Sequence, residues 1–345
     1  IELASVLAGP AVGQFFAELG AKVIKIENAT VGGDVTRQWK VRGESADKVD
    51  SAYYRCVNYG KEVRFLDLKE TAAQQEVHHL VRDADLVISN FKEAQGRRLK
   101  VDVQTLGQLN PKLIYAQLHA FGAKDDRPAY DIVLQAEAGF LAMTGTKNGE
   151  LCRMPVALID LLAAHQLKEG ILLALIQRYK TGQGALVTTS LYASALASLA
   201  NQATNYLIAD FIPQPQGTEH PNIAPYGDVF TLQDGCRIVL AIGNDRQFVA
   251  LCEGLELTVP EHLTSNVKRV AHREELIRFL EDKIQHCSLS EIWHLCKSRN
   301  IPIGHVKNMA EVFAEATSQA QLLRYSDGQQ TVKTVVFEVG ELPLA

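Results

Sequence analysis

The chain has 345 residues, of which 47% are hydrophobic and 22% charged, with 24 glycines and 11 prolines. This length allows two or three domains, and the ordinary globular composition excludes a disulfide-stapled module, a disordered chain and a collagen-like repeat. The 35 Lys and Arg residues face 40 Asp and Glu, a formal net charge of −5, so a dedicated nucleic-acid binder is not expected.

No apolar run approaches the ~20 residues that a transmembrane helix needs, so the chain is not expected to interact with a membrane. The chain opens at Ile1 inside an expected strand and without Met, which indicates a clipped start and leaves targeting undecided. Six widely spaced cysteines form no C-x-x-C pair, which favours reduced thiols and a cytoplasmic location. The His and Cys residues between positions 286 and 296 have poor ligand spacing, so no metal is expected.

Short β-branched runs alternate with amphipathic stretches over the first 120 residues. This alternation predicts an α/β fold, with parallel strands joined by crossover helices. Strands are expected at residues 1–3, 22–26, 85–89 and 112–118. Helices are expected at residues 11–19, ended by Gly20, then just before Asp83, and at 103–109.

The strongest helix prediction covers residues 161–180, where apolar residues recur at helical spacing and Asp160 takes the N-cap position. A strand at 186–190 and a long helix at about 191–208 follow. Residues 211–226 hold four prolines and indicate a linker. The second unit is expected to have strands at 229–232 and 237–242, and helices at 245–252, 273–286 and 290–298.

These elements predict four parts of the chain. The parts are a large domain at 1–210, a linker at 211–226, a small domain at 227–300, and a return segment at 301–345 that runs back toward the large domain.

The turn after the first expected strand reads Leu7-Ala8-Gly9-Pro10 and precedes a helix N-terminus, a place that suits an anionic ligand. It is not a dinucleotide fingerprint, because Pro10 follows Gly9 and the next glycine is Gly13. Glu27 does imitate the ribose-binding acid of that motif. NAD binding is therefore disfavoured.

Several short blocks of residues follow one another along the chain, and their order matters for the resemblance that they carry. They are residues 3–10, 19–27, 33–37, 58–69, 110–115, 130–131, 135–136, 144–145, 155–160, 178 with 181–184, and 220–227. In this order they span nearly the whole chain and resemble the class III coenzyme A transferases, the CaiB/BaiF family of formyl-CoA and carnitine-CoA transferases.

The resemblance implies a Rossmann-like parallel-sheet large domain, a smaller α+β domain, and two chains interlocked as a homodimer. It also implies coenzyme A as the co-substrate, in the form of an acyl-CoA, with a free carboxylic acid as the second substrate.

The family's nucleophile corresponds to Asp160. A carboxylate that attacks a thioester gives a mixed anhydride, which the CoA thiolate converts to an aspartyl-CoA thioester that the acceptor acid opens. We expect the helix N-terminus to keep Asp160 charged, and its amides to serve developing oxyanions. A purely structural Asp160 would be the N-cap.

Tyr130 distinguishes the branches of the family. Related acyl-CoA racemases carry a His immediately before the residue that matches Asp131, as base for an α-proton. A Tyr hydroxyl, with a pKa near 10, is a poor base for that proton. A transferase with Asp160, Tyr130 and Gln14 as catalytic residues is therefore favoured. A racemase of the same fold and a non-catalytic CoA-binding protein are the alternatives.

The resemblance also places basic and polar side chains around coenzyme A, since Arg can bond two phosphate oxygens. The matching positions are Arg37, Lys61, Asn90, Phe91 and Arg98, with Asp131 and the Ala8 and Gly9 backbone. Gln14, Ala8 and Gly9 are expected near the thioester, with Gly9 allowing close approach.

The chain departs from the family in two places. Glu93-Ala94 follows Lys92 where the family usually has Pro-Gly, and the glycine-rich loop of formyl-CoA transferases is missing. Formyl-CoA and oxalate are therefore not the expected substrates. The block at 220–227 resembles the branch that acts on larger acids, such as carnitine-like or dicarboxylic acceptors.

Overall fold

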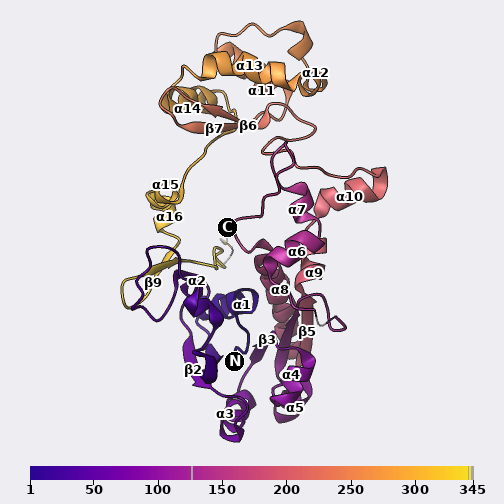
Figure 1. Ribbon diagram of the computed structural model, residues 1–345, viewed down its shortest axis with the longest axis vertical. Coiled ribbons are helices and arrows are strands. Elements are labelled where there is room, and N and C mark those ends of the chain that lie inside the picture. Colours follow the sequence, from indigo (N-terminus) through magenta and orange to yellow (C-terminus); the bar gives the residue numbers. More distant parts are fainter. Residues whose placement is uncertain (126, 341, 343–345) are drawn as a thin grey trace. The chain divides into compact units, whose positions relative to one another are not determined.

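The computed structural model describes residues 1–125, 127–340 and 342, and its chain forms two compact units. Unit 1 comprises Ile1–Leu141, Arg153–Pro213 and Ala320–Ala345, and unit 2 comprises Ala142–Cys152 and Gln214–Gln319. The chain enters each unit more than once, as its colours show (Figure 1).

Unit 1 is an α/β unit with short 3₁₀ helices (η1, η2) among its elements. In chain order they are α1 (Ala8–Glu18), β1 (Ile24–Asn28), η1 (Ala29–Val31), η2 (Val35–Gln38), α2 (Ala52–Arg55), β2 (Glu62–Leu66), α3 (Thr71–Arg82), β3 (Leu86–Ser89), α4 (Glu93–Arg98), α5 (Val103–Leu109), β4 (Ile114–His119), α6 (Asp131–Glu137), α8 (Leu158–Thr181), β5 (Ala185–Ser190), α9 (Leu191–Ala197), α10 (Ala200–Ala209), β9 (Leu322–Arg324) and β10 (Gln330–Val332). The short α7 (Phe140–Met143) crosses the sequence boundary between the units.

The main sheet of unit 1 is parallel throughout. β1 pairs with β2, and β3, β4 and β5 pair in that order. Glu2 joins the two groups, because it forms parallel bridges to both Lys25 and Ile88. Residues 1–3 therefore lie between β1 and β3, and the chain then builds outward from them in both directions.

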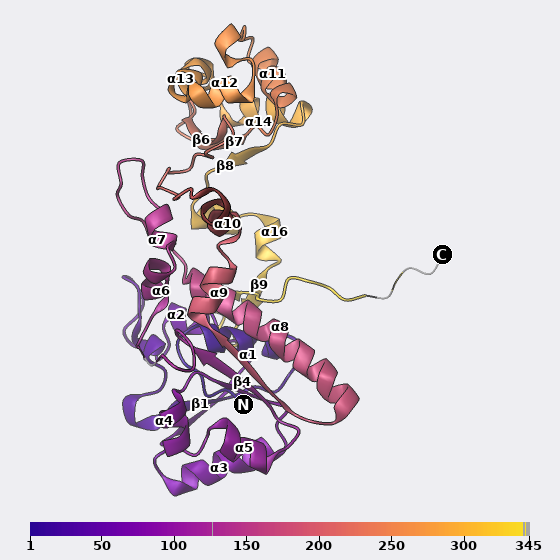
Figure 2. The same cartoon turned by 90° about the vertical axis from the view of Figure 1, so that its right-hand side faces the viewer.

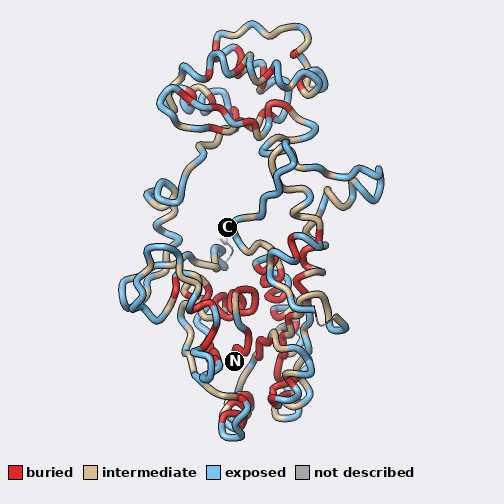
Figure 3. The backbone as a smooth tube through the Cα atoms, viewed as in Figure 1, coloured by how far each residue is buried: buried red, intermediate tan, exposed pale blue. Residues whose placement is uncertain are grey.

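Helices cover both faces of this sheet, because successive strand residues point to opposite sides. Ile88 and Ala116 belong to a core shared with α1, α8 and α9, whereas Val87 and Tyr115 belong to a core shared with α3 and α5. Figure 2 shows α8 running along one face, and Figure 3 shows the buried residues gathered on the strands and on the inner sides of these helices.

Most predicted elements of unit 1 are confirmed, with shifted ends. The expected helix at 191–208 is in fact two helices, because the chain breaks between α9 and α10. There the Ser198 hydroxyl bonds back to the Ser194 carbonyl, and Ala200 adopts a φ of 47°. The strand β2 was not predicted, because the alternation in Glu62–Leu66 leaves charged residues on a half-buried edge strand.

Unit 2 has an antiparallel sheet in the order β6-β7-β8 under a layer of helices. Its elements are β6 (Tyr226–Thr231), β7 (Arg237–Ala241), α11 (Asp245–Gly254), η3 (Glu261–Leu263), α12 (Asn266–Ala271), α13 (Arg273–Ile284), α14 (Leu289–Ser298), β8 (Ile303–His305), α15 (Met309–Phe313) and α16 (Ala316–Gln319). The Ile238 and Leu240 side chains of β7 pack with Phe248, Leu276 and Leu280 in a core of its own.

Within the described ranges, none of the helices combines the length and the apolar character that crossing a bilayer requires.

Candidate active site

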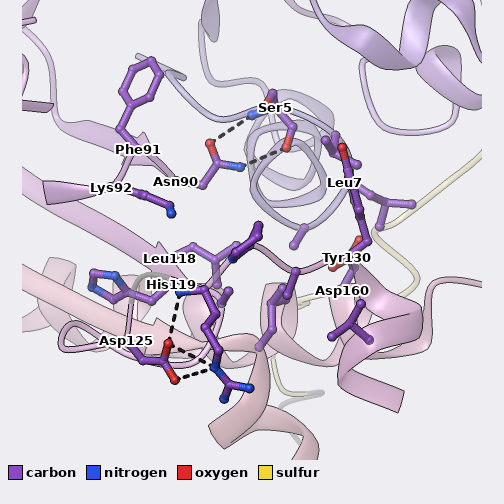
Figure 4. Close-up of a pocket in the computed structure, with 18 of the residues that line it drawn as sticks. Ser5, Leu7, Asn90, Phe91, Lys92, Leu118, His119, Asp125, Tyr130 and Asp160 are labelled. Carbon is purple, nitrogen blue, oxygen red and sulfur yellow. Dashed lines mark hydrogen bonds and ion pairs between the residues drawn. The ribbon is translucent and has the colours of Figure 1, made fainter. Parts of the chain in front are cut away.

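A pocket of about 520 Å³ opens in unit 1 at the carboxyl ends of residues 1–3, β3 and β4. It is lined by the turn at 5–8, by residues 90–92 and 118–120, and by Tyr130 and Asp160 (Figure 4). In open parallel sheets, ligands bind at the topological switch point, where the strand order reverses. In this sheet the switch point lies between residues 1–3 and β3. The topology therefore places a binding site where the pocket is found.

Asp160 is the carboxylate that the fold presents to this pocket. It lies in the first turn of α8 and is only 7% exposed. Its carboxylate makes no hydrogen bond and no ion pair with any described residue. Burial, helped by the negative charge of Asp131, raises the pKa of Asp160 to about 7. A half-ionised carboxyl without a partner is expensive to keep, and such groups cluster at functional sites.

Asp131 takes the place at the α8 N-terminus that Asp160 was expected to fill. Its Oδ1 accepts hydrogen bonds from the amides of Ile159 (2.7 Å) and Asp160 (3.4 Å). The Gln135 side chain donates to Oδ2 of Asp131 and accepts from the Met154 amide (3.0 Å). Asp131 thereby satisfies amides that are otherwise free at the start of a helix.

Two expectations for Asp160 are therefore wrong. It is not the N-cap of α8, since the helix starts at Leu158 with Ala157 in the N-cap position. Nor does the helix N-terminus keep its pKa low, because burial disfavours the charged form and the Asp131 carboxylate, which occupies the amides, repels a second negative charge.

Three aromatic side chains contact one another in series, beginning at Tyr130 on the pocket wall. Tyr130 is the N-cap residue of α6, is 58% exposed, and meets Trp39 edge-to-face with ring centroids 6.1 Å apart. Trp39 in turn meets Tyr53 at 5.0 Å. Burial and the charge of Asp160 raise the pKa of Tyr53, so its hydroxyl stays protonated near the nucleophile candidate. Trp39 and Tyr53 were not predicted, because a lone aromatic in a loop or short helix carries no signal of its own.

Three of the predicted coenzyme-binding residues line the pocket. Ala8, Asn90 and Phe91 do so, and Phe91 also borders a neighbouring pocket of about 110 Å³ that Arg98 lines. Lys92, His119 and Arg127 add basic side chains to the main pocket. Figure 4 shows Lys92 and His119 on the side away from Asp160.

Arg37 and Lys61, also predicted to bind the coenzyme, lie in buried ion pairs instead of on the pocket wall. The Arg37 guanidinium donates to both oxygens of Glu27 (2.7 and 2.9 Å), to the Tyr54 hydroxyl (2.6 Å) and to Asp50. Glu27, the acid that imitates a ribose ligand, is thereby engaged. The Lys61 ammonium contacts Glu2 at 2.7 Å, and its burial lowers its pKa to about 8.

Gln14 and Gly9 also stand behind the pocket wall. Gln14 is fully buried, donating to Glu18 (2.9 Å) and accepting from the Tyr59 amide (3.0 Å). At Gly9, a Cβ would come within 2.3 Å of the Ala4 Cβ, so close packing of α1 on the strand explains this glycine. In the part of the chain that the structure describes, no three His, Cys, Asp or Glu side chains are grouped to hold a metal ion.

The chain matches CoA-transferase family III over residues 1–344. It is 37% identical to a succinate–glutarate CoA-transferase of Agrobacterium fabrum over 94% of this chain and 82% of that one. It is 32% identical to a human succinyl-CoA:glutarate CoA-transferase, over 91% of this chain and 72% of that one. The fold matches a crystal structure of a CaiB/BaiF family protein from Brucella suis, with a TM-score of 0.86, 33% identity and coverage of 97% and 90%.

The raised pKa of Asp160 predicts a pH-dependent gain in stability on substitution. Between the unfolded pKa, about 3.9, and the folded pKa, about 7, the folded chain holds a proton that the unfolded chain has lost. Wild type therefore loses stability over this range relative to Asp160→Asn. At pH 8 we expect the free energy of unfolding of the variant to exceed that of wild type by a few kcal/mol, since each pKa unit is worth about 1.4 kcal/mol. The difference should vanish near pH 4. Urea titrations at both pH values measure it.

Asp102→Asn is the matched control, because Asp102 is also buried but its side-chain and backbone hydrogen bonds outweigh burial and lower its pKa. This variant should be less stable than wild type at pH 8, with the gap closing only below about pH 4. A stability difference for Asp160→Asn that does not change between pH 4 and 8 would contradict the raised pKa.

Proposed function

The chain belongs to CoA-transferase family III and is a CoA transferase; from this premise we propose that it moves coenzyme A from an acyl-CoA to a free carboxylic acid through covalent intermediates on Asp160. The observation that carries the proposal is the buried Asp160 carboxylate, which has no partner among the described side chains and lines a ligand-sized pocket together with the turn at 5–8.

In the proposed reaction, an Asp160 oxygen attacks the thioester carbonyl, the C–S bond breaks, and the CoA thiolate leaves with the electron pair. The thiolate then attacks Cγ of Asp160 in the mixed anhydride, and the donor acid leaves with the bridging oxygen. The acceptor carboxylate attacks Cγ of the aspartyl-CoA thioester, the C–S bond breaks, and the CoA thiolate departs, leaving a second anhydride on Asp160. The thiolate attacks the acceptor's carbonyl, which releases the new acyl-CoA and free Asp160. No net proton transfer is needed.

The environment of Asp160 suits this role. A raised pKa makes the ionised carboxylate more reactive than an ordinary surface Asp, while a pKa of about 7 leaves much of it ionised at neutral pH. The exposed Tyr130 side chain lines the pocket and can contact an acyl group or a carboxylate there, and the Tyr53 hydroxyl stays protonated under the influence of Asp160. We assign Tyr130 to substrate positioning.

We assign coenzyme A to the side of the pocket that Ala8, Asn90 and Phe91 line, with Arg98 beside Phe91 for a phosphate. A supporting role, holding the backbone behind the pocket wall, would then fall to Arg37, Lys61, Gln14 and Gly9. Asp131 would act by helping to raise the pKa of Asp160. The strand order of unit 1 supports the Rossmann-like description of its sheet.

We propose dicarboxylic acids as the substrate class. The similar proteins from Agrobacterium fabrum and human are named for succinate or succinyl-CoA and glutarate, which all carry a second carboxylate. Lys92 on the pocket wall has the charge that would attract that second group. Arg127 also lines the pocket, but its guanidinium is paired with Asp125 and Glu137 (both 3.1 Å).

We also propose a homodimer. Apolar side chains stand exposed on α10 and the segment after it, including Leu207 (78%), Ile208 (80%) and Ile212 (64%). Exposed apolar clusters of this kind mark protein interfaces. A monomeric mass in solution would refute this part of the proposal. The expected cytoplasmic location stays a prediction.

Trapping experiments test the covalent role of Asp160. Wild type mixed with succinyl-CoA and treated with hydroxylamine or borohydride should carry a CoA-dependent modification on the peptide that contains Asp160, detected by mass spectrometry. Asp160→Asn should show no modification and lose transfer activity on the order of 10³-fold or more, because the nucleophile is gone.

Asp125→Asn is the control, since Asp125 is a second carboxylate on the same pocket wall and lies away from Asp160. Its peptide map should still show the modification on Asp160. Full transfer activity of Asp160→Asn would defeat the proposal. Deuterium uptake at the substrate α-carbon without acid exchange would indicate a racemase instead.

The pH dependence of acylation gives a further prediction. The single-turnover rate of anhydride formation should rise with pH through an apparent pKa near 7, because only ionised Asp160 attacks. Asp131→Asn removes the neighbouring negative charge, so its rate should reach the plateau at lower pH. Glu137→Gln makes the same charge change at the exposed end of α6 and should leave the apparent pKa in place. An unshifted profile for Asp131→Asn would contradict the assigned role of Asp131.

A further inference from the structure

The turn that enters α1 has a strained backbone. Val6 adopts a φ of 73°, in the left-handed region, although it is a β-branched residue and not glycine. This region disfavours a residue with a Cβ by a factor of about 5 to 30, and β-branched residues are genuine outliers there. Such a conformation persists only where the surroundings hold it, and it occurs most often at functional sites.

Side chains hold the backbone of this turn at Ala4, Ser5 and Val6. The Asp34 Oδ2 accepts from the Val6 amide (3.1 Å), and the Lys25 ammonium donates to the Ala4 carbonyl (2.9 Å). Asn90 accepts from the Ser5 amide (3.3 Å) and donates to the Ser5 carbonyl (3.1 Å), as Figure 4 shows. Peptide groups that would otherwise be free to rotate are thus pinned from two sides.

The two charged side chains that hold the turn, Lys25 and Asp34, are themselves fixed by ion pairs. The Lys25 ammonium lies 3.1 Å from Oδ2 of Asp34 and 2.8 Å from Glu2, and all three side chains are at most 1% exposed. Burial alone would raise the pKa of Asp34, but the Lys25 charge and hydrogen bonds from Thr36 outweigh it and lower that pKa. Asp34 is therefore an ionised acceptor, and its Oδ1 is fixed by the Thr36 amide and hydroxyl.

The turn at residues 5–8 faces the same pocket as Asp160, the candidate nucleophile. Val6, Leu7, Ala8 and Asp160 all line it, and Figure 4 shows Leu7 on the side where Tyr130 and Asp160 lie. Among the described residues, the amides of Leu7 and Ala8 have no acceptor, because they precede the first full turn of α1 and no side chain caps that helix. Asp160 is an acid without a partner that lines the same pocket, and only 7% of its surface is exposed.

We propose that Asp34 is a positioning residue for the transfer reaction: with Lys25 it holds Val6 in its left-handed conformation, so that the Leu7 and Ala8 amides receive the negative charge that develops on the carbonyl oxygen attacked by Asp160. This inference rests on the proposed function, since it concerns the tetrahedral species formed on that carbonyl. Donors fixed in advance stabilise such charge far better than donors that must rotate into place.

The test compares kcat and KM for Asp34→Ala, Asp34→Asn, Val6→Gly and the double variant Asp34→Ala/Val6→Gly. Asp34→Ala should lower kcat about 100-fold, the usual effect of losing an oxyanion donor, with a much smaller change in KM. Asp34→Asn keeps an oxygen for the Val6 amide and should recover most of this loss. In the Val6→Gly background the Asp34→Ala loss should shrink to about 10-fold or less, because glycine adopts positive φ without strain.

Asp102→Ala separates positioning from stability, because Asp102 is likewise a buried carboxylate that accepts backbone amides, at the start of α5 away from the pocket. It should lower the free energy of unfolding and leave kcat unchanged. The proposal is overturned if Asp34→Ala behaves like Asp102→Ala, or if its loss of kcat is equal in the Val6 and Val6→Gly backgrounds. An inactive wild type without an Asp160 adduct would overturn the proposed function as well, so the two failures are distinguishable.

Discussion

The two hydrogen bonds from the Ile159 and Asp160 amides to the Asp131 carboxylate fix which of two neighbouring acids receives the amides at the start of α8. A helix N-terminus normally stabilises the nearest carboxylate, and in α8 that carboxylate is Asp131. Asp160, the third residue of α8, is then left buried, unpaired and beside a like charge, which raises its pKa to about 7. Gln135 holds Asp131 from the other side, so α6 and α8 together leave one carboxyl group hydrogen-bonded and the other without a partner.

The buried charges behind the pocket wall are held in ion pairs, unlike the Asp160 carboxylate, and this contrast supports the assignment of Asp160. Lys25 lies between Glu2 and Asp34, and Arg37 donates to both oxygens of Glu27. These pairs lie behind the pocket wall, where they connect residues 1–3, β1 and the loop before η2. They give the turn at Val6 a rigid support, which a site needs when catalysis depends on groups placed before the reaction starts.

The sequence predicted the parallel α/β unit well, because hydrophobic periodicity, glycine stops and strand runs are local signals. It also predicted that Asp160, Tyr130, Ala8, Asn90 and Phe91 share one site, and all five line the same pocket, although their roles stay predictions. It could not assign partners to buried charges. Arg37 has the chemistry of a phosphate ligand, yet only the tertiary fold shows that Glu27, Asp50 and Tyr54 take up its donors. The N-cap expected for Asp160 failed for the same reason, since Asp131 lies 29 residues earlier in the chain.

Oxygen labelling tests the central claim, that acyl groups pass through the Asp160 carboxylate, most directly. The acceptor acid is supplied with both carboxylate oxygens as ¹⁸O in unlabelled water, and the enzyme is digested after many turnovers. The account predicts that one ¹⁸O remains on Asp160 each time the acceptor's anhydride is resolved, so the Asp160 peptide gains about 2 Da per label. Formation of labelled acyl-CoA with an unlabelled Asp160 peptide would contradict it, because the acids would then exchange coenzyme A without bonding to the enzyme.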